Sequence, residues 1–143
     1  MNGNETNLGY FNRQAAQDHG DRVAIVDLSG PDPVNVSHAM LDDRMDRVAA
    51  ALQGFGLEPG DRLLLATGNR FEFIEVFFGA MRAGIVPIPL NHKLGADTIR
   101  FVIRDADARA AIVVPGCHPD ITDIVEDAGL SPRISIGMPR DGW

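Results

Sequence analysis

The sequence predicts an α/β fold, with a mostly parallel sheet of about four strands flanked by helices, preceded by a helix and a small β-hairpin. From residue 62 onward, short apolar runs alternate with helical patterns, which is the order of a parallel sheet with right-handed crossovers. Earlier, two strand-like runs are separated only by the turn-rich "SGPDP", which indicates an antiparallel hairpin. The 143 residues, 45% hydrophobic and 23% charged, are typical of one globular domain or a compact piece of a larger one.

The first part of the chain reads as helix, hairpin and helix. "YFNRQAAQDHG" predicts a short helix that Gly20 ends in a left-handed cap. Strands are expected at 23–28 and 34–36, and Ser37 is placed to cap the next helix. One face of that helix is apolar, whereas its acidic and basic residues are expected to face solvent. The apolar positions are Leu41, Met45, Val48, Ala49 and Leu52, and the charged ones are Asp42, Asp43, Arg44, Asp46 and Arg47.

The second part alternates strands and helices. "RLLLAT" is a continuous apolar run, as expected of a strand covered on both faces. The run "IVPIPL" holds Pro87 and Pro89, which lie two apart, so both missing donors fall on one side and predict an edge strand or an irregular junction. Strands are predicted at 62–67, 85–90, 109–114 and 133–136, and helices at 71–83, 95–108 and 119–128.

Composition excludes several classes of function. The net charge of −7 argues against a nucleic-acid partner, since phosphate binding favours a basic face. A single cysteine, Cys117, excludes an internal disulfide framework and fits a reducing compartment. We find no secretory signal and no apolar run long enough to span a membrane, so a cytoplasmic protein is expected.

Motifs that carry chemistry are scarce. No G-x-x-x-x-G-K-[ST] phosphate loop and no G-x-S-x-G nucleophile motif occurs. The glycines of "GFGLEPG" are misspaced for a dinucleotide site and follow a helix, so they predict a turn. Cys117 and His118 are adjacent with no second cysteine, which favours a helix cap or surface pair over a zinc site. The acidic pairs Asp42–Asp43 and Asp105/Asp107 are interpreted as solvated helix faces. No catalytic or metal-binding residue is therefore predicted.

Four phenylalanines cluster between residues 71 and 78. They are candidates for an acyl pocket or for core. Phe77 and Phe78 share a helix face with Ile74 and Met81, which favours core beneath a sheet, whereas Phe73 lies off that face.

The order of several segments resembles the N-terminal region of the adenylate-forming (AMP-binding) acyl-CoA synthetases, the superfamily that includes fatty-acid–CoA ligases, luciferases and peptide-synthetase adenylation domains. The segments are "DRVAIVDLSG", "SHAMLDDRMDRVAAALQGFGLEPGDRLLLATGNRFEFIEVFFGAMRAGIVPIPLNHKL" and "DADARAAIVV". The resemblance covers roughly residues 10–136 and rests on several collinear segments. It divides the chain into a helix and hairpin over 10–36 and an α/β unit over 37–136.

Two family motifs fall inside this region. "MRAGIVPIPLN" is similar to the second core motif, which makes Gly84, Pro87, Pro89 and Asn91 its structural residues. The first core motif is degraded to "VSHAML", with His38 where a tyrosine is common and Met40 where a glutamate is common.

The resemblance implies an ATP-dependent ligase that converts a carboxylic acid to an acyl-adenylate and then to an acyl-CoA. The parent enzyme would use ATP, magnesium and CoA, whereas this chain is expected to bind none of them as a cofactor. The family's Ser/Thr/Gly-rich phosphate loop, its aromatic–T-E segment, its ribose-binding aspartate and its C-terminal lysine are missing from the 143 residues. The chain alone, whether a designed piece, a proteolytic fragment or a natural short protein, is thus expected to be inactive.

The resemblance gives one residue a role near a substrate. Lys93 follows "PLN", where family members often carry a basic residue that meets the phosphates of the CoA nucleotide. A solvated lysine is the alternative.

Two other classes of function stay open or are disfavoured. A freestanding interaction or ligand-binding module could use the same fold. A receiver-like signalling domain is disfavoured because "RLLLAT" and "IVPIPL" end without an aspartate. The acyl group could be fatty, aryl or short. A piece of a larger domain is expected to expose apolar surface and could self-associate through it.

Overall fold

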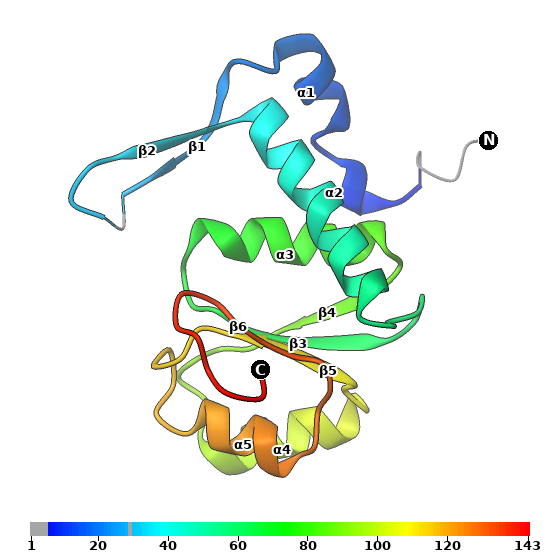
Figure 1. Ribbon diagram of the computed structural model, residues 1–143, viewed down its shortest axis with the longest axis vertical. Helices are drawn as coiled ribbons and strands as arrows, with labels where there is room; N and C mark the ends of the chain where they lie inside the picture. The colour runs from blue at the N-terminus through cyan, green and yellow to red at the C-terminus, as the bar shows by residue number, and fades with distance from the viewer. Residues whose placement is uncertain (1–5, 29) are drawn as a thin grey trace. The chain divides into compact units, whose positions relative to one another are not determined.

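The computed structural model describes residues 6–28 and 30–143 (Figure 1). They form two compact units. Unit 1 comprises the chain up to residue 58 together with 70–84, and unit 2 comprises 59–69 and 85–143.

Unit 2 is built on a four-stranded parallel sheet, which confirms the predicted α/β fold. The spatial order is β4-β3-β5-β6, so the chain adds β4 on one side of β3 and then β5 and β6 on the other. Two helices of this unit, α4 and α5, lie together on one face of the sheet (Figure 1). The bounds are β3 Arg62–Ala66, β4 Val86–Pro89, α4 Ala96–Asp105, β5 Ala110–Val113, α5 Ile121–Asp127 and β6 Arg133–Ser135.

The core of unit 2 follows from the two-residue period of the strands. Leu64 and Ala66 of β3 point to the same face as Ala111 and Val113 of β5, and all four are buried. The apolar stripes of α4 and α5 cover them with Ile99, Ile103, Ile121, Ile124 and Val125. β3 reads as an unbroken apolar run because Leu63 and Leu65, on its other face, are buried as well.

The prolines of β4 lie as their spacing predicts. β4 pairs only with β3 among the described strands. Val86 N–H donates to Asp61 O at 2.8 Å and Leu90 N–H to Leu65 O at 2.9 Å. Since alternate residues of a strand face its neighbour, Pro87 and Pro89 direct their nitrogens to the unpaired edge. The expectation of an edge strand is confirmed.

Unit 1 contains the predicted hairpin and three longer helices. Ser37 Oγ accepts the Met40 N–H at 3.2 Å and caps α2, as expected. Gly20 ends α1, but its φ of −50° shows that the predicted left-handed cap is wrong; a Cβ here would lie 2.8 Å from Ala16 O. The bounds are η1 Leu8–Tyr10, α1 Arg13–His19, β1 Val23–Asp27, β2 Val34–Ser37, α2 His38–Gly54 and α3 Phe71–Arg82.

A small apolar core holds unit 1 together. Val36, Leu41 and Met45 are its buried centre, against which Ile25 and Phe78 pack. Phe78 is half-buried, and its ring lies 4.3 Å from that of Phe11, centre to centre. Phe78 thus belongs to the core of unit 1, together with Phe71 and Ile74.

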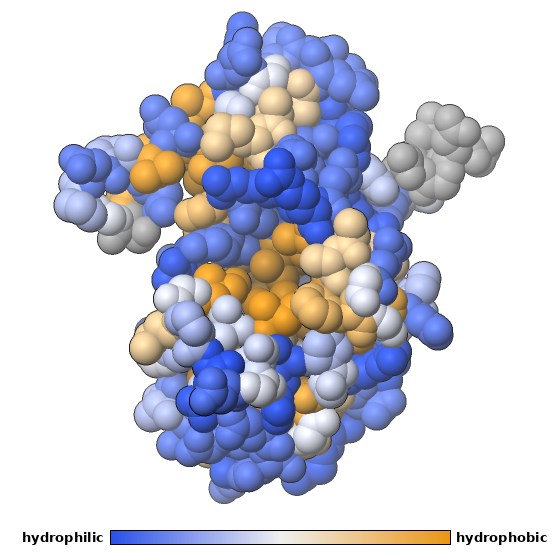
Figure 2. All heavy atoms as spheres, viewed as in Figure 1, coloured by the Kyte–Doolittle hydropathy of each residue, from blue (hydrophilic) through white to orange (hydrophobic). Residues whose placement is uncertain are grey.

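The hairpin leaves large aliphatic side chains uncovered. Val23, Val26, Leu28 and Val34 are each about half or more exposed. Figure 2 shows hydrophobic, orange spheres along the hairpin. Two strands alone seldom form a stable sheet in water, so this surface is suited to being covered.

Replacing Val86 by proline tests which side of β4 donates hydrogen bonds to β3. Val86 is exposed, so Val86→Pro removes the bond to Asp61 O with little loss of packing. We expect unfolding free energy to fall by about 1–3 kcal/mol. The matched variant Pro89→Val, which restores a donor on the unpaired edge, should change it by less than about 1 kcal/mol. Urea unfolding measures both, and equal losses would contradict this arrangement.

Candidate functional site

Ligands of open parallel sheets bind beyond the carboxyl ends of the strands. In unit 2 these ends lead into the loops 67–69, 90–95 and 114–120. β3 connects toward β4 and β5 toward β6, so the direction of the connections reverses between β3 and β5. This edge is the candidate site that the fold itself indicates.

Lys93 lies at this edge, in the loop that follows β4. Its backbone N–H donates to Asn91 Oδ1 at 2.9 Å, and Leu94 N–H donates to Asn91 O at 3.1 Å. Asn91 therefore shapes the turn that presents Lys93. The Lys93 side chain is exposed and makes no ion pair with any residue the structure describes. A role in binding CoA stays a prediction.

Gly84 lies just before β4, and the two prolines lie within it. Gly84 has a φ of 75° directly after α3, a conformation that favours glycine and lets the chain turn toward β4. Pro87 and Pro89 then keep β4 at the edge. Their roles as family-motif residues remain predictions, while their positions show how the motif leads to Asn91.

Cys117 and His118 connect the loop after β5 to its neighbours. Cys117 Sγ donates to Ala66 O at 3.1 Å, and desolvation by burial raises the pKa of its thiol. His118 is buried, with Nε2 3.0 Å from Leu94 O and Nδ1 3.1 Å from the Asp120 N–H. A carbonyl only accepts and an N–H only donates, so Nε2 carries a proton and donates while Nδ1 accepts.

Both nitrogens of His118 are thus engaged within the protein, which leaves neither for a metal. Across residues 6–28 and 30–143, no group of three or more His, Cys, Asp or Glu side chains could hold a metal ion. Over the same residues, no helix combines the length and apolarity needed to cross a membrane.

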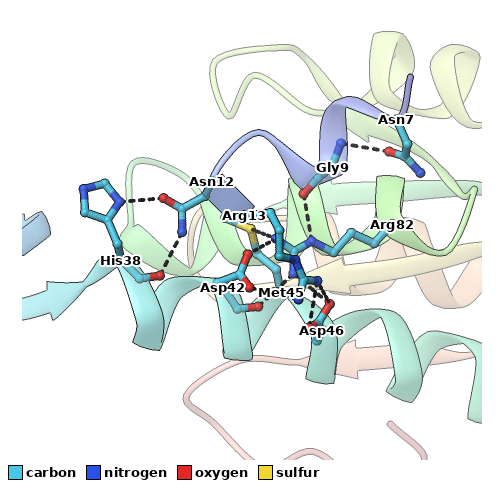
Figure 3. Close-up of polar contacts among 9 residues, drawn as sticks. All are labelled: Asn7, Gly9, Asn12, Arg13, His38, Asp42, Met45, Asp46 and Arg82. Carbon is cyan, nitrogen blue, oxygen red and sulfur yellow. Dashed lines mark hydrogen bonds and ion pairs between the residues drawn. The ribbon is translucent and has the colours of Figure 1, made fainter. Parts of the chain in front are cut away.

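The densest polar cluster of unit 1 surrounds Arg82 at the end of α3 (Figure 3). Its side chain is only 1% exposed. Nε donates to Gly9 O at 2.8 Å; Nη1 donates to Asp42 O at 2.8 Å and to Asp46 Oδ1 at 2.7 Å. Nη2 donates to Asp42 Oδ1 at 2.5 Å and contacts Met45 Sδ at 3.4 Å. All five guanidinium donors are used, so Arg82 is a structural residue.

A second arginine balances the charge of this cluster. Arg13 lies 3.2 Å from Asp42 Oδ2 and 2.8 Å from Asp46 Oδ1, so two cations face two carboxylates. The Tyr10 ring lies 4.9 Å from the guanidinium carbon of Arg82 and 5.1 Å from that of Arg13. These contacts fix the segment before α1 against α2 and α3.

The space around Gly9 shows how closely this segment packs. A Cβ at Gly9 would lie 2.7 Å from both Arg82 N and Phe78 O, closer than real side chains come to backbone atoms. Beside it, Asn12 Nδ2 donates to His38 O at 2.8 Å, and Asn12 Oδ1 lies 2.6 Å from His38 Nδ1 (Figure 3). His38, in the degraded first core motif, therefore anchors the N-terminal segment to the start of α2.

The expectation that Asp42 faces solvent is wrong. Asp42 is 7% exposed and directed at Arg82. Helical periodicity assigns charged residues to the outer faces and contains no information on a partner 40 residues away. Asp105 and Asp107 are exposed as expected. The signal for the exception was Arg82 itself, which lies in an otherwise apolar helical run.

Glu75 is a second buried charge on α3. Arg44 Nη1 donates to Glu75 Oε1 at 2.7 Å, and the Arg44 guanidinium carbon lies 5.3 Å from the Phe71 ring. Desolvation raises the pKa of Glu75 despite the Arg44 partner. In contrast, the hydrogen bond from Arg70 lowers the pKa of the more exposed Glu72. The pair Arg44–Glu75 joins α2 to α3.

Comparison with known proteins gives consistent results. The family described as "AMP-binding enzyme" matches residues 11–139. The 4-hydroxybenzoate–CoA/benzoate–CoA ligase of Rhodopseudomonas palustris is 30% identical, over 91% of this chain and 24% of that ligase. The long-chain-fatty-acid–CoA ligase FadD13 of Mycobacterium tuberculosis is 31% identical, over 74% of this chain and 21% of its own.

Solved structures agree with the sequence relatives. A benzoate CoA ligase from Burkholderia xenovorans superposes with a TM-score of 0.80 at 26% identity, over 90% of this chain and 25% of that one. The chain thus spans about a quarter of the length of the proteins it matches.

Substitution of Arg82 tests whether its cluster holds unit 1 together. Arg82→Met leaves Asp42 buried without its main partner, so we expect a loss of about 3–5 kcal/mol in unfolding free energy. Arg47→Met removes an exposed pair with Asp43 and should cost less than about 1 kcal/mol. Urea unfolding followed by circular dichroism compares the two. Similar small losses for both variants would refute a structural role for Arg82.

Proposed function

Because the chain belongs to the AMP-binding enzyme family, we propose that it is the N-terminal portion of an ATP-dependent acyl-CoA ligase. The observation that carries this proposal is the match over residues 11–139, which agrees with relatives named as acyl-CoA and aryl-CoA ligases. The helix and hairpin at 10–36 and the α/β unit at 37–136 would together form one subdomain of its large domain.

The proposed reaction has two steps. A carboxylate oxygen attacks the α-phosphorus of ATP, which forms an acyl-adenylate and releases pyrophosphate. The thiolate of CoA then attacks the acyl carbon, and AMP leaves. Catalysis of such transfers depends on positioning and on charge stabilisation around the phosphates. Relatives are named for aryl and long-chain fatty acids, so the proposal specifies a carboxylic acid and no narrower class.

The 143 residues alone are proposed to be inactive. They lack a phosphate loop, and their described part supplies no cluster for magnesium. The uncovered aliphatic side chains of the hairpin and the quarter-length match also support a part that works within a longer protein. The cytoplasm is the proposed location, since ATP and CoA are available there and the single cysteine fits a reducing compartment.

Lys93 is the residue of this chain that we propose to meet a substrate. It is exposed at the carboxyl edge of the sheet on a turn fixed by Asn91. An ammonium there is a suitable partner for a CoA nucleotide phosphate, which is dianionic at neutral pH. The contact would be made in the second step of the reaction, because CoA takes no part in the first.

Exchange of labelled pyrophosphate into ATP tests whether the complete protein forms an acyl-adenylate and whether the 143 residues alone do not. We expect the 143-residue chain to give no exchange with any carboxylic acid, because its sequence lacks the phosphate loop that would hold ATP. The protein encoded by the complete reading frame should give exchange that depends on an aryl or fatty acid. Exchange by the 143 residues alone would refute their inactivity, and its absence from the complete protein with all acids tried would refute the ligase.

Substitution of Lys93 in the complete protein tests its role. Lys93→Ala should raise the KM for CoA by about tenfold, as expected for loss of one charge-assisted contact of about 1.4 kcal/mol. Acid-dependent pyrophosphate exchange should stay unchanged. Arg47→Ala, which alters an exposed charge on α2, is the control. An unchanged KM for CoA would remove Lys93 from the site.

A further inference from the structure

A groove in unit 2 is lined by the C-terminal parts of α4 and α5 and by the turns that follow them. Its volume is about 490 Å³, within the range of ligand and side-chain pockets. Its lining combines apolar residues with four charged ones. They are Arg100, Ile103, Arg104, Asp107, Ala108, Ile124, Asp127, Ala128 and Leu130.

The floor of the groove is apolar and belongs to the core. Ile103, Ile124 and Leu130 are each at most 5% exposed and fix its depth. Ala108 and Ala128 line it with single methyl groups, which leaves the space open. An apolar group that enters would be covered on the floor and the sides.

The two walls carry opposite charges. On the α4 wall, Arg100 is paired with Asp97 at 3.2 Å, whereas Arg104 makes no ion pair with a described residue. Asp107, in the turn that follows α4, is paired with Arg62, whereas Asp127 at the end of α5 makes no ion pair within the described chain. The groove thus offers one available cation on α4 and one available carboxylate on α5.

An exposed aromatic ring stands beside the groove. Phe101 of α4 is 56% exposed. It lies three residues before Arg104, so these two side chains are neighbours on the helix surface. The chain therefore carries, on one helix, both an apolar groove and a side chain of the kind that fills such a groove.

We propose that this surface is a self-complementary interface between two copies of the chain. In a two-fold arrangement, Phe101 of each copy enters the groove of the other. Arg104 of each copy then meets Asp127 of the other, so both available charges are paired twice. A small apolar ligand would leave these charges unpaired, which is why a second copy fits better. The inference does not depend on the proposed ligase activity.

The charge pairs also decide which surfaces meet. Each copy carries a net charge of −7, so association without specific pairs is opposed by repulsion. Two Arg104–Asp127 pairs offset this repulsion only in the two-fold arrangement. The contact is small beside a standard interface, so the dimer should be weak and its dissociation constant in the micromolar range or above.

Sedimentation velocity of the 143-residue chain from about 10 µM to about 1 mM tests the dimer. Arg104→Asp and Asp127→Arg each place like charges opposite one another and should weaken association at least tenfold. The double variant exchanges the charges and should restore association to within about threefold, because each new pair has the original geometry with the signs reversed. Phe101→Ser should weaken association at least tenfold, and adding the double charge variant should not restore it.

The exposed hairpin provides the matched control. Val26→Ser with Val34→Ser removes apolar side chains of unit 1 far along the chain from the groove, and it should leave the dimer unchanged. Circular dichroism verifies that each variant is folded. The proposal is overturned by a monomer at all concentrations, by a dimer that the charge reversals leave intact, by failure of the double variant to restore association, or by a dimer that only the hairpin variant dissociates.

Discussion

The buried guanidinium of Arg82 is the constraint on which the arrangement of unit 1 depends. A guanidinium removed from water is tolerated only where its charge and all five donors are satisfied. Two carboxylates of α2, two backbone carbonyls and a sulfur meet that condition. Because one of the carbonyls belongs to Gly9, the segment before α1 must lie where α2 and α3 meet. A single ion thereby fixes the positions of three segments that are remote in sequence.

Elements with a local cause could be predicted from the sequence. The strands and helices of unit 2 follow from apolar periodicity, the start of α2 from Ser37, and the edge position of β4 from its two prolines. The role of Asp42 could not be predicted, because its helix position is that of a solvated residue while its partner lies on another helix. The cap at Gly20 was wrong for a related reason. The space there is limited by Ala16 O in the preceding turn and by Ala39 Cβ of α2, so lack of room for a Cβ favours glycine, and a positive φ does not.

In the candidate site, too, some features have a local cause in the sequence and others depend on distant contacts. The turn at Asn91 and the exposure of Lys93 follow from their place after a parallel strand. The tautomer of His118 depends on Leu94 and Asp120, and no motif in the sequence indicates that Leu94 lies beside it. These contacts join the loops after β4 and β5. A ligand at the carboxyl edge would therefore meet loops that are already held together before it binds.

The prolines of β4 also have a consequence for how the sheet is assembled during synthesis. β3 and β4 leave the ribosome before β5 and β6, so any pairing of β3 with β4 at that stage would form a two-stranded sheet with two open edges. On its β4 side, positions 87 and 89 offer no donor to a strand from another chain. On its β3 side, the edge stays available to β5, which is made next. The growing sheet thus offers a full set of hydrogen-bond donors only on the β3 edge, where β5 of the same chain will pair. The missing donors on the β4 edge limit the addition of strands from other chains during translation.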